Sequence, residues 1–269
     1  MLILLNESGQ TGNRLRSLSS LVALGLEMHQ DVYCPVVPKE FFEYFKMQFS
    51  TKCDIRVNFS CNSFFSEFIK VVRIACGNKD IKLNNGKITI FTDWISFAKP
   101  ELNQIHYQRI KDFFDFTEEF KKSCKTKMPE KKYDSEMLVG VHLRRGDYQN
   151  WKNGAYYFEV EEFIQQMRFL YAENNKIHFV IFSNEIIDVS IFEREPYDVS
   201  LMKGNAYEDL CCMSLCDYII GPPSTFSSWA GYIGNKKLVW MKEKNHCYGF
   251  SEFQSVPDSM LTTKAFWKY

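Results

Sequence analysis

Residues 137–148 read MLVGVHLRRGDY, an apolar run that ends in two arginines, a glycine and an aspartate. The run Met137–His142 predicts a buried β-strand. Two arginines at the end of a buried strand are costly unless an anion or a carboxylate receives them. Because a guanidinium presents a planar fork of donors that matches phosphate oxygens, Arg144 and Arg145 predict an anion-binding loop. The alternative is an ion pair between an arginine and Asp147 that closes the loop.

Strand-like and helix-like segments alternate on both sides of this stretch. Further strands are predicted at Met1–Asn6, Asp31–Val37, Lys87–Phe91, Lys176–Phe182, Tyr218–Gly221 and Lys237–Met241. Helices are predicted at Asn13–Gln30, 101–125, 157–174, 205–216 and Ser224–Gly234. Such alternation is typical of α/β layers built on a largely parallel sheet.

Residues 121–134, KKSCKTKMPEKKYD, interrupt this alternation with six lysines and a proline. We interpret the interruption as a boundary between two α/β domains, residues 1–130 and 131–269. A solvated linker is the simpler interpretation of Lys121–Lys132. The other interpretation is a surface that rests on anionic lipid, which would matter if the substrate were linked to a lipid.

Four of the predicted strands end in loops rich in hydrogen-bond donors. These loops are Gly9–Arg14, His142–Asp147, Ser183-Asn184-Glu185 and Pro222–Ser227. Ligands of parallel α/β sheets bind beyond the carboxyl ends of the strands, so we expect all four loops to face one crevice. Ser224 and Thr225 open a helix, whose free N–H groups receive phosphates readily. The alternative is that these hydroxyls only cap the helix.

Composition and charge bear on partners and location. Lys+Arg and Asp+Glu balance at 33 each, which argues against a nucleic-acid partner because no excess basic charge remains. Neither a secretory signal nor an apolar run of about 20 residues is evident, so a cytoplasmic protein is expected. The nine cysteines are scattered, and most are expected to be reduced core residues. Cys211, Cys212 and Cys216 lack a partner cluster at zinc-ligand spacing, so no metal is expected.

Three motifs together resemble one enzyme family. HLRRGDY (142–148) resembles the His-x-Arg-Arg-Gly-Asp-Tyr motif of the α-1,2-fucosyltransferases, glycosyltransferase family 11, and more loosely the His-x-Arg motif of α-1,6- and protein O-fucosyltransferases. Residues 213–229, which end in STFSSW, resemble a later motif of the same enzymes, and Gly9–Asn13 resembles their N-terminal glycine turn. The order and spacing agree across nearly the whole chain.

This resemblance implies a GT-B-like fold, in which two Rossmann-like domains enclose the donor-binding crevice between them. The N-terminal domain would face the acceptor and the C-terminal domain would bind the GDP-sugar. The implied reaction is inverting and needs no metal: fucose moves from GDP-fucose to a hydroxyl of a glycan acceptor, a galactoside with α-1,2 linkage.

The resemblance also implies roles for individual residues. Arg144 would hold the β-phosphate, Asp209 would bind guanine, and Asn13 would face the sugar from the first domain. The implied catalytic residues are Arg144, Asp147 and Asn13. The implied donor-binding residues are Gly12, His142, Arg144, Arg145, Ser183, Asn184, Asp209, Ser224, Thr225 and Phe226. The general base stays open between Asp147, Glu7 and the β-phosphate itself.

Several positions depart from the family pattern and leave the acceptor open. Arg14 replaces a usual Gln, Ser183-Asn184-Glu185 replaces a more acidic segment, and Ser228 replaces an aromatic residue. The aromatic residues of Phe41–Phe49 and Phe59–Phe68 are either core or platforms for acceptor sugars. Two other functions remain open: transfer from a different nucleotide sugar, and nucleotide or glycan binding without catalysis.

Overall fold

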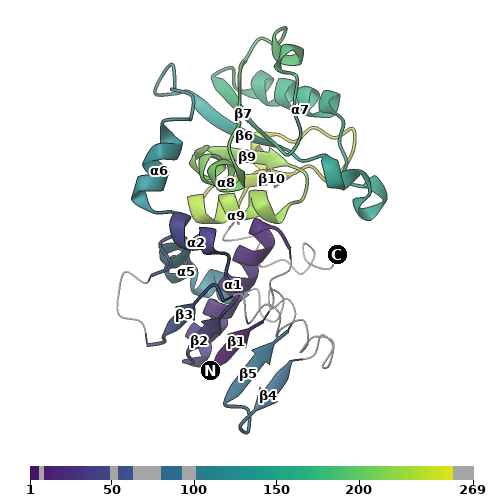
Figure 1. Ribbon diagram of the computed structural model, residues 1–269. Helices are drawn as coiled ribbons and strands as arrows, with labels where there is room; N and C mark the ends of the chain where they lie inside the picture. The colour runs from purple at the N-terminus through teal and green to yellow at the C-terminus, as the bar shows by residue number, and fades with distance from the viewer. Residues whose placement is uncertain (6–8, 49–53, 63–79, 93–100, 257–269) are drawn as a thin grey trace. The chain divides into compact units, whose positions relative to one another are not determined.

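The computed structural model describes residues 1–5, 9–48, 54–62, 80–92 and 101–256 (Figure 1). These residues form two compact units, which divide after Glu118. The lysine-rich residues 121–134 therefore begin the second unit, whereas the sequence placed the boundary after residue 130. The physical reason is that this segment is tied to the second unit: Cys124 is buried, its carbonyl accepts from the Cys212 thiol at 3.6 Å, and Lys127 pairs with Glu208.

The first unit is a mostly parallel sheet with helices. Its elements are β1 (Leu2–Leu4), α1 (Thr11–Met28), β2 (Val32–Cys34), α2 (Lys39–Tyr44), β3 (Val57–Phe59), β4 (Ile81–Leu83), β5 (Ile88–Phe91), α4 (Glu101–Ile105) and α5 (Tyr107–Phe114). The strand order is β3-β2-β1-β5-β4, in which only β4 runs antiparallel to its neighbour. Phe41 and Phe45 are fully buried, so these two aromatic residues belong to the core. Residues 63–68 lie outside the described ranges.

The second unit has a longer sheet. Its elements are α6 (Glu118–Lys125), β6 (Met137–Leu143), the short turns η1 (Gly146–Gln149) and η2 (Trp151–Gly154), α7 (Val160–Glu173), β7 (Ile177–Ser183), η3 (Val189–Phe192), β8 (Asp198–Leu201), α8 (Ala206–Leu215), β9 (Tyr218–Gly221), α9 (Thr225–Gly234), β10 (Lys237–Trp240), η4 (Phe250–Glu252) and β11 (Gln254–Ser255). The strand order is β11-β10-β9-β6-β7-β8, parallel except for β11.

Strand β6 lies at the centre of this sheet. Its residue Val139 is in register with Phe179 of β7 on one side and Tyr218 of β9 on the other. From β6 the chain builds outward through β7 and β8, and α8 then returns it to β9 on the opposite side. The strand order therefore reverses between β6 and β9, and this reversal is where doubly wound α/β sheets bind their ligands.

The sheet is held by a large apolar core on the face that α7 covers. Phe179 and Ile181 of β7 pack with Phe163, Met167 and Leu170 of α7, and all five side chains are buried. Burial of that much apolar surface fixes the central strands, and with them the positions of the loops at their carboxyl ends. The predicted α/β class is confirmed, with two Rossmann-like units; a donor crevice between them stays a prediction.

Candidate active site

The turn that follows β6 is held by the loop that follows β7. Gly146 has a φ of 25°, and a Cβ there would lie 2.5 Å from the Asn184 amide nitrogen. The Asn184 side-chain oxygen accepts from the Arg145 backbone N–H at 3.3 Å, and Glu185 Oε1 accepts from the Gly146 N–H at 2.9 Å. Glycine is therefore favoured at position 146, and Asn184 and Glu185 fix the backbone from which both arginines project.

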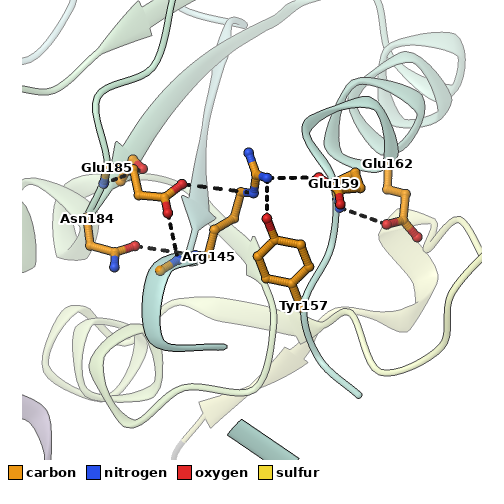
Figure 2. Close-up of polar contacts among 8 residues, drawn as sticks. Arg145, Tyr157, Glu159, Glu162, Asn184 and Glu185 are labelled. Carbon is orange, nitrogen blue, oxygen red and sulfur yellow. Dashed lines mark hydrogen bonds and ion pairs between the residues drawn. The ribbon is translucent and has the colours of Figure 1, made fainter. Parts of the chain in front are cut away.

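Arg145 is enclosed by acidic and phenolic side chains, as Figure 2 shows. Its guanidinium donates to Glu159 at 2.8 Å and to the Tyr157 hydroxyl, and it lies 3.9 Å from Glu185. Burial alone would lower the pKa of Arg145, but the Tyr157 hydrogen bond and the two carboxylates raise it above its usual value. Arg145 is thus a fixed cation that joins β6, the start of α7 and the loop after β7.

Arg144 has different surroundings. Its Nη2 atom lies 2.9 Å from Asp147, whose side chain is 56% exposed. The guanidinium carbon also lies 5.7 Å from the centre of the Tyr148 ring. The alternative interpretation, an Arg–Asp pair across the loop, is therefore realised in the structure. Because Asp147 is mostly exposed, a phosphate at the Arg144 guanidinium can replace or join it without burying an unpaired charge.

His142 is a buried, neutral ring beside this loop. It is 4% exposed, and burial, aided by the charge of Arg144, lowers its pKa to about 3. Among the described residues its Nδ1 atom is buried with no hydrogen-bond partner. The ring centre lies 5.5 Å from that of Phe226. A buried polar atom without a partner is a place where a ligand can complete the hydrogen bonding.

The loop after β9 brings a helix N-terminus to the same place. A Cβ at Gly221 would lie 2.5 Å from the His142 carbonyl, so only glycine allows β9 to approach β6 this closely. Ser224 caps α9 by accepting from the Phe226 N–H at 3.2 Å, as the capping alternative predicted. The Tyr148 hydroxyl donates to the Pro223 carbonyl at 2.6 Å, and burial raises the pKa of Tyr148 to about 12, so it remains a donor. The two loops are thereby joined.

Asp209 lies in the first turn of α8. This helix starts after β8 and runs back across the sheet, so its N-terminus is at the carboxyl edge of the strands. Burial raises the pKa of Asp209 to about 6, against an opposing hydrogen bond from the Gly204 backbone, and within the described chain its buried Oδ1 atom has no hydrogen bond of good geometry. A carboxylate oxygen in that state is suited to accept N–H groups from a ligand.

The structure gathers most of the predicted site residues in the second unit. Ser183, the last residue of β7, accepts from the Glu185 N–H at 3.1 Å. Gly12 and Asn13 lie in the first turn of α1, in the first unit, so their part in the same site stays a prediction. Glu7 lies outside the described residues. The contacts of Tyr148, Tyr157 and Glu159 were missed, and only the last had a sequence signal, the capping pattern Glu159–Glu162 at the start of a helix.

A different cluster lies at the opposite edge of the sheet. In the described part of the chain, ligand atoms of Glu136, His178 and Asp198 come within 4.8 Å of one another, an arrangement that could hold a metal ion. These residues stand at or before the starts of β6, β7 and β8, and Lys132 already pairs with Asp198 at 2.5 Å. The cluster is thus separate from the loop His142–Asp147 that carries Arg144 and Arg145, which we call the arginine loop.

Comparison with known protein families gives a match that spans the second unit. The model of glycosyl transferase family 11 matches residues 90–268, which contain the arginine loop, the α8 carboxylate and the α9 cap. The chain belongs to glycosyl transferase family 11. The resemblance noted in the sequence is therefore confirmed, and the protein is a glycosyltransferase. No curated protein matches the sequence.

Solved structures of two other transferases share the fold of this family 11 enzyme. The α-1,6-fucosyltransferase NodZ, in crystals soaked with GDP-fucose, is 13% identical, with a TM-score of 0.60 over 92% of this chain and 97% of its own. Crystals of NodZ from Bradyrhizobium give 0.59 at 13% identity over 92% and 96%. POFUT1 in complex with GDP gives 0.58 at 11% identity over 90% and 98%. The predicted GT-B-like fold is thereby confirmed.

Proposed function

We propose that this family 11 enzyme transfers fucose from GDP-fucose to a hydroxyl of a glycan acceptor, with inversion and without a metal. The observation that carries the proposal is the grouping of Arg144, the unpartnered His142 nitrogen and the N-terminus of α9 at the strand-order reversal. These groups suit a diphosphate. The ligands named for NodZ and POFUT1, GDP-fucose and GDP, support this donor.

The main demand of the reaction is stabilisation of the negative charge that develops on the leaving group. As the acceptor oxygen bonds to the anomeric carbon, the bond from that carbon to the β-phosphate oxygen breaks, and its electron pair stays on GDP. Arg144 and the free N–H groups at the start of α9 stabilise this developing charge. Arg145, engaged by Glu159 and Glu185, contributes mainly by fixing the loop.

Binding of the rest of the donor involves other elements. Asp209 accepts from the guanine N–H groups, His142 and Phe226 line the nucleotide, and Asn13 contributes from the first unit. The acceptor proton passes to a carboxylate or to the departing β-phosphate. Asp147 is the candidate carboxylate on the arginine loop, and its pairing with Arg144 equally supports a positioning role.

A panel of GDP-, UDP- and TDP-sugars in EDTA tests the donor. Thermal stabilisation and slow hydrolysis with GDP-fucose alone are expected. A selective response to another sugar nucleotide would favour the second transferase hypothesis, and nucleotide binding without turnover on any acceptor would favour a non-catalytic protein. A galactoside acceptor and an α-1,2 linkage are then read from the product by mass spectrometry and NMR.

We further propose a cytoplasmic location, which the buried free thiols of Cys34, Cys211 and Cys216 support. None of the helices in the described ranges is long and apolar enough to cross a membrane. We also propose a peripheral contact at the inner membrane face through Lys121–Lys132, toward a lipid-linked acceptor, on the basis of the six lysines of residues 121–134. Lys127, Lys131 and Lys132 also pair with carboxylates of the protein itself.

A further inference from the structure

The loop between the arginines and α7 has an unusual composition. Residues 148–157 read YQNWKNGAYY: four aromatic residues, three amides and a single charge. Gln149, Asn150 and Asn153 are all exposed. Aromatic rings with exposed amides around them offer an apolar surface whose rim both donates and accepts hydrogen bonds.

Trp151 is the centre of this loop. It is 38% exposed, yet its ring centre lies 4.8 Å from that of Tyr148 and 5.5 Å from that of Tyr156, at angles of 43° and 38°. The indole is therefore oriented by two neighbouring rings while a large part of it faces solvent. The Lys152 ammonium lies 5.8 Å from the ring, on a flexible stem that a ligand can displace.

The backbone beside Trp151 is strained. Lys152, Asn153 and Gly154 have φ values of 52°, 56° and 72°, so three consecutive residues adopt the left-handed conformation. Lysine in that conformation costs about 1 kcal/mol. Such strain persists only where the surrounding structure imposes it, and it is concentrated at ligand sites.

Trp151 stands next to the diphosphate-binding group. Arg144 packs on Tyr148 at 5.7 Å, and Tyr148 packs on Trp151 at 4.8 Å, so a single ring separates the indole from the guanidinium. The guanine-binding carboxylate of the proposed function is on another element, α8. In the proposed function, the exposed surface of Trp151 is therefore near the reacting end of the donor and is not used to bind the nucleotide.

We propose that Trp151 forms the floor of a subsite for a neutral pyranose ring of the acceptor, with Gln149, Asn150 and Asn153 as partners for its hydroxyl groups. This inference rests on the proposed function. One face of a pyranose is made of C–H groups, which pack on an indole by dispersion and hydrophobic contact. The amides match uncharged hydroxyls, whereas a phosphate would call for further cations.

The test compares Trp151→Ala with Phe169→Ala, a control that removes an aromatic residue of similar exposure, 41%, from α7. We expect Trp151→Ala to raise the acceptor KM about tenfold, the scale of a lost aromatic contact. The GDP-fucose KM, the acceptor-free hydrolysis rate and the unfolding temperature should stay within twofold or a few degrees. Trp151→Phe, which keeps a ring and the packing on Tyr148, should restore most of the affinity.

An unchanged acceptor KM in a folded Trp151→Ala enzyme would overturn the subsite. So would a matching loss of donor hydrolysis, because Trp151 would then serve the nucleotide. If the wild-type enzyme neither hydrolyses nor transfers from GDP-fucose, the proposed function fails instead. Calorimetric titration with the methyl glycosides of galactose, glucose and N-acetylglucosamine then decides the subsite alone: binding that Trp151→Ala abolishes supports it, and binding that survives refutes it.

Discussion

At the scale of single residues, the two adjacent arginines differ in what surrounds them. Arg145 faces Glu159, Glu185 and Tyr157, whereas Arg144 pairs with the exposed Asp147 beside the α9 N-terminus. Because the proposed mechanism assigns the charge of the leaving diphosphate to Arg144, Arg144→Ala should lower kcat about 100- to 1000-fold. The unfolding temperature should hardly change.

Single-turnover assays with GDP-fucose measure this loss, and circular dichroism checks the fold. Arg168→Ala is the matched control, because Arg168 also forms an Arg–carboxylate pair, with Glu195 at 2.6 Å, on the exposed side of α7. Near-normal turnover in Arg144→Ala would remove the central group of the proposed mechanism.

Asp209 gives a pH dependence with a defined sign. Its folded-state pKa is raised to about 6 by burial, above the value of about 3.9 for an unfolded aspartate. The folded protein therefore keeps a proton that the unfolded chain loses, and the free energy of unfolding falls as pH rises from about 4 to 6. Above pH 6 the free energy of unfolding bears the full cost of the buried, ionised Asp209 carboxylate. Asp209→Asn should stabilise the ligand-free protein at pH 7.5 by about 1 kcal/mol, a value discounted for partial exposure.

Urea unfolding at pH 4.5 and 7.5 checks this, with the exposed Asp134→Asn as control. The stabilisation should shrink at the lower pH. GDP affinity should also fall in the wild type below pH 6 and be weak in Asp209→Asn throughout, because protonation or amidation removes the carboxylate that we propose accepts guanine N–H groups. A GDP affinity that changes neither with pH nor in Asp209→Asn would show that guanine is bound by other residues.

At the scale of elements, the strained backbone of the turn η2 lowers stability but is expected to favour acceptor binding. Glycine adopts the left-handed conformation of Lys152 without a Cβ penalty, so Lys152→Gly should be more stable than Lys152→Ala by about 1 kcal/mol. Both variants lose the same ammonium group, so their difference isolates the backbone. The glycine variant should nonetheless have the higher acceptor KM, because a freer backbone no longer fixes Trp151. Equal stability of the two variants in urea would show that the left-handed turn is not kept in solution.

The elements also show what the sequence could predict. Strands β6, β7 and β9 are long or strongly apolar, and their continuous apolar runs were sufficient to place them and the loops at their ends. Strand β8, Asp198–Leu201, was missed because it is short, half-exposed and stabilised by pairing with β7 rather than by its own pattern. The contacts of Arg145 could not be predicted for a related reason. Tyr157, Glu159 and Glu185 reach Arg145 only in the folded chain, so the charge pattern of the sequence could not show that the two arginines have different surroundings.

At the scale of the whole molecule, the two compact units should respond differently to nucleotide. His142, Arg144, Asp209 and Ser224 all belong to the second unit, so GDP at 100 times its Kd should stabilise that unit by about 2.7 kcal/mol. Hydrogen exchange with and without GDP measures this residue by residue. Protection should rise across β6, β7 and the start of α9.

Hydrogen exchange in the first unit then tests whether that unit also contacts the donor. If Gly12 and Asn13 contribute, amides of the first turn of α1 should also gain protection, while β4, at the sheet edge, serves as an internal control. Protection confined to the second unit would leave Arg144 and Asp209 in their proposed roles but would assign Asn13 to the acceptor or to the fold. Protection that appears only with GDP-fucose, and not with GDP, would instead place Asn13 on the sugar, because that is the part of the donor GDP lacks.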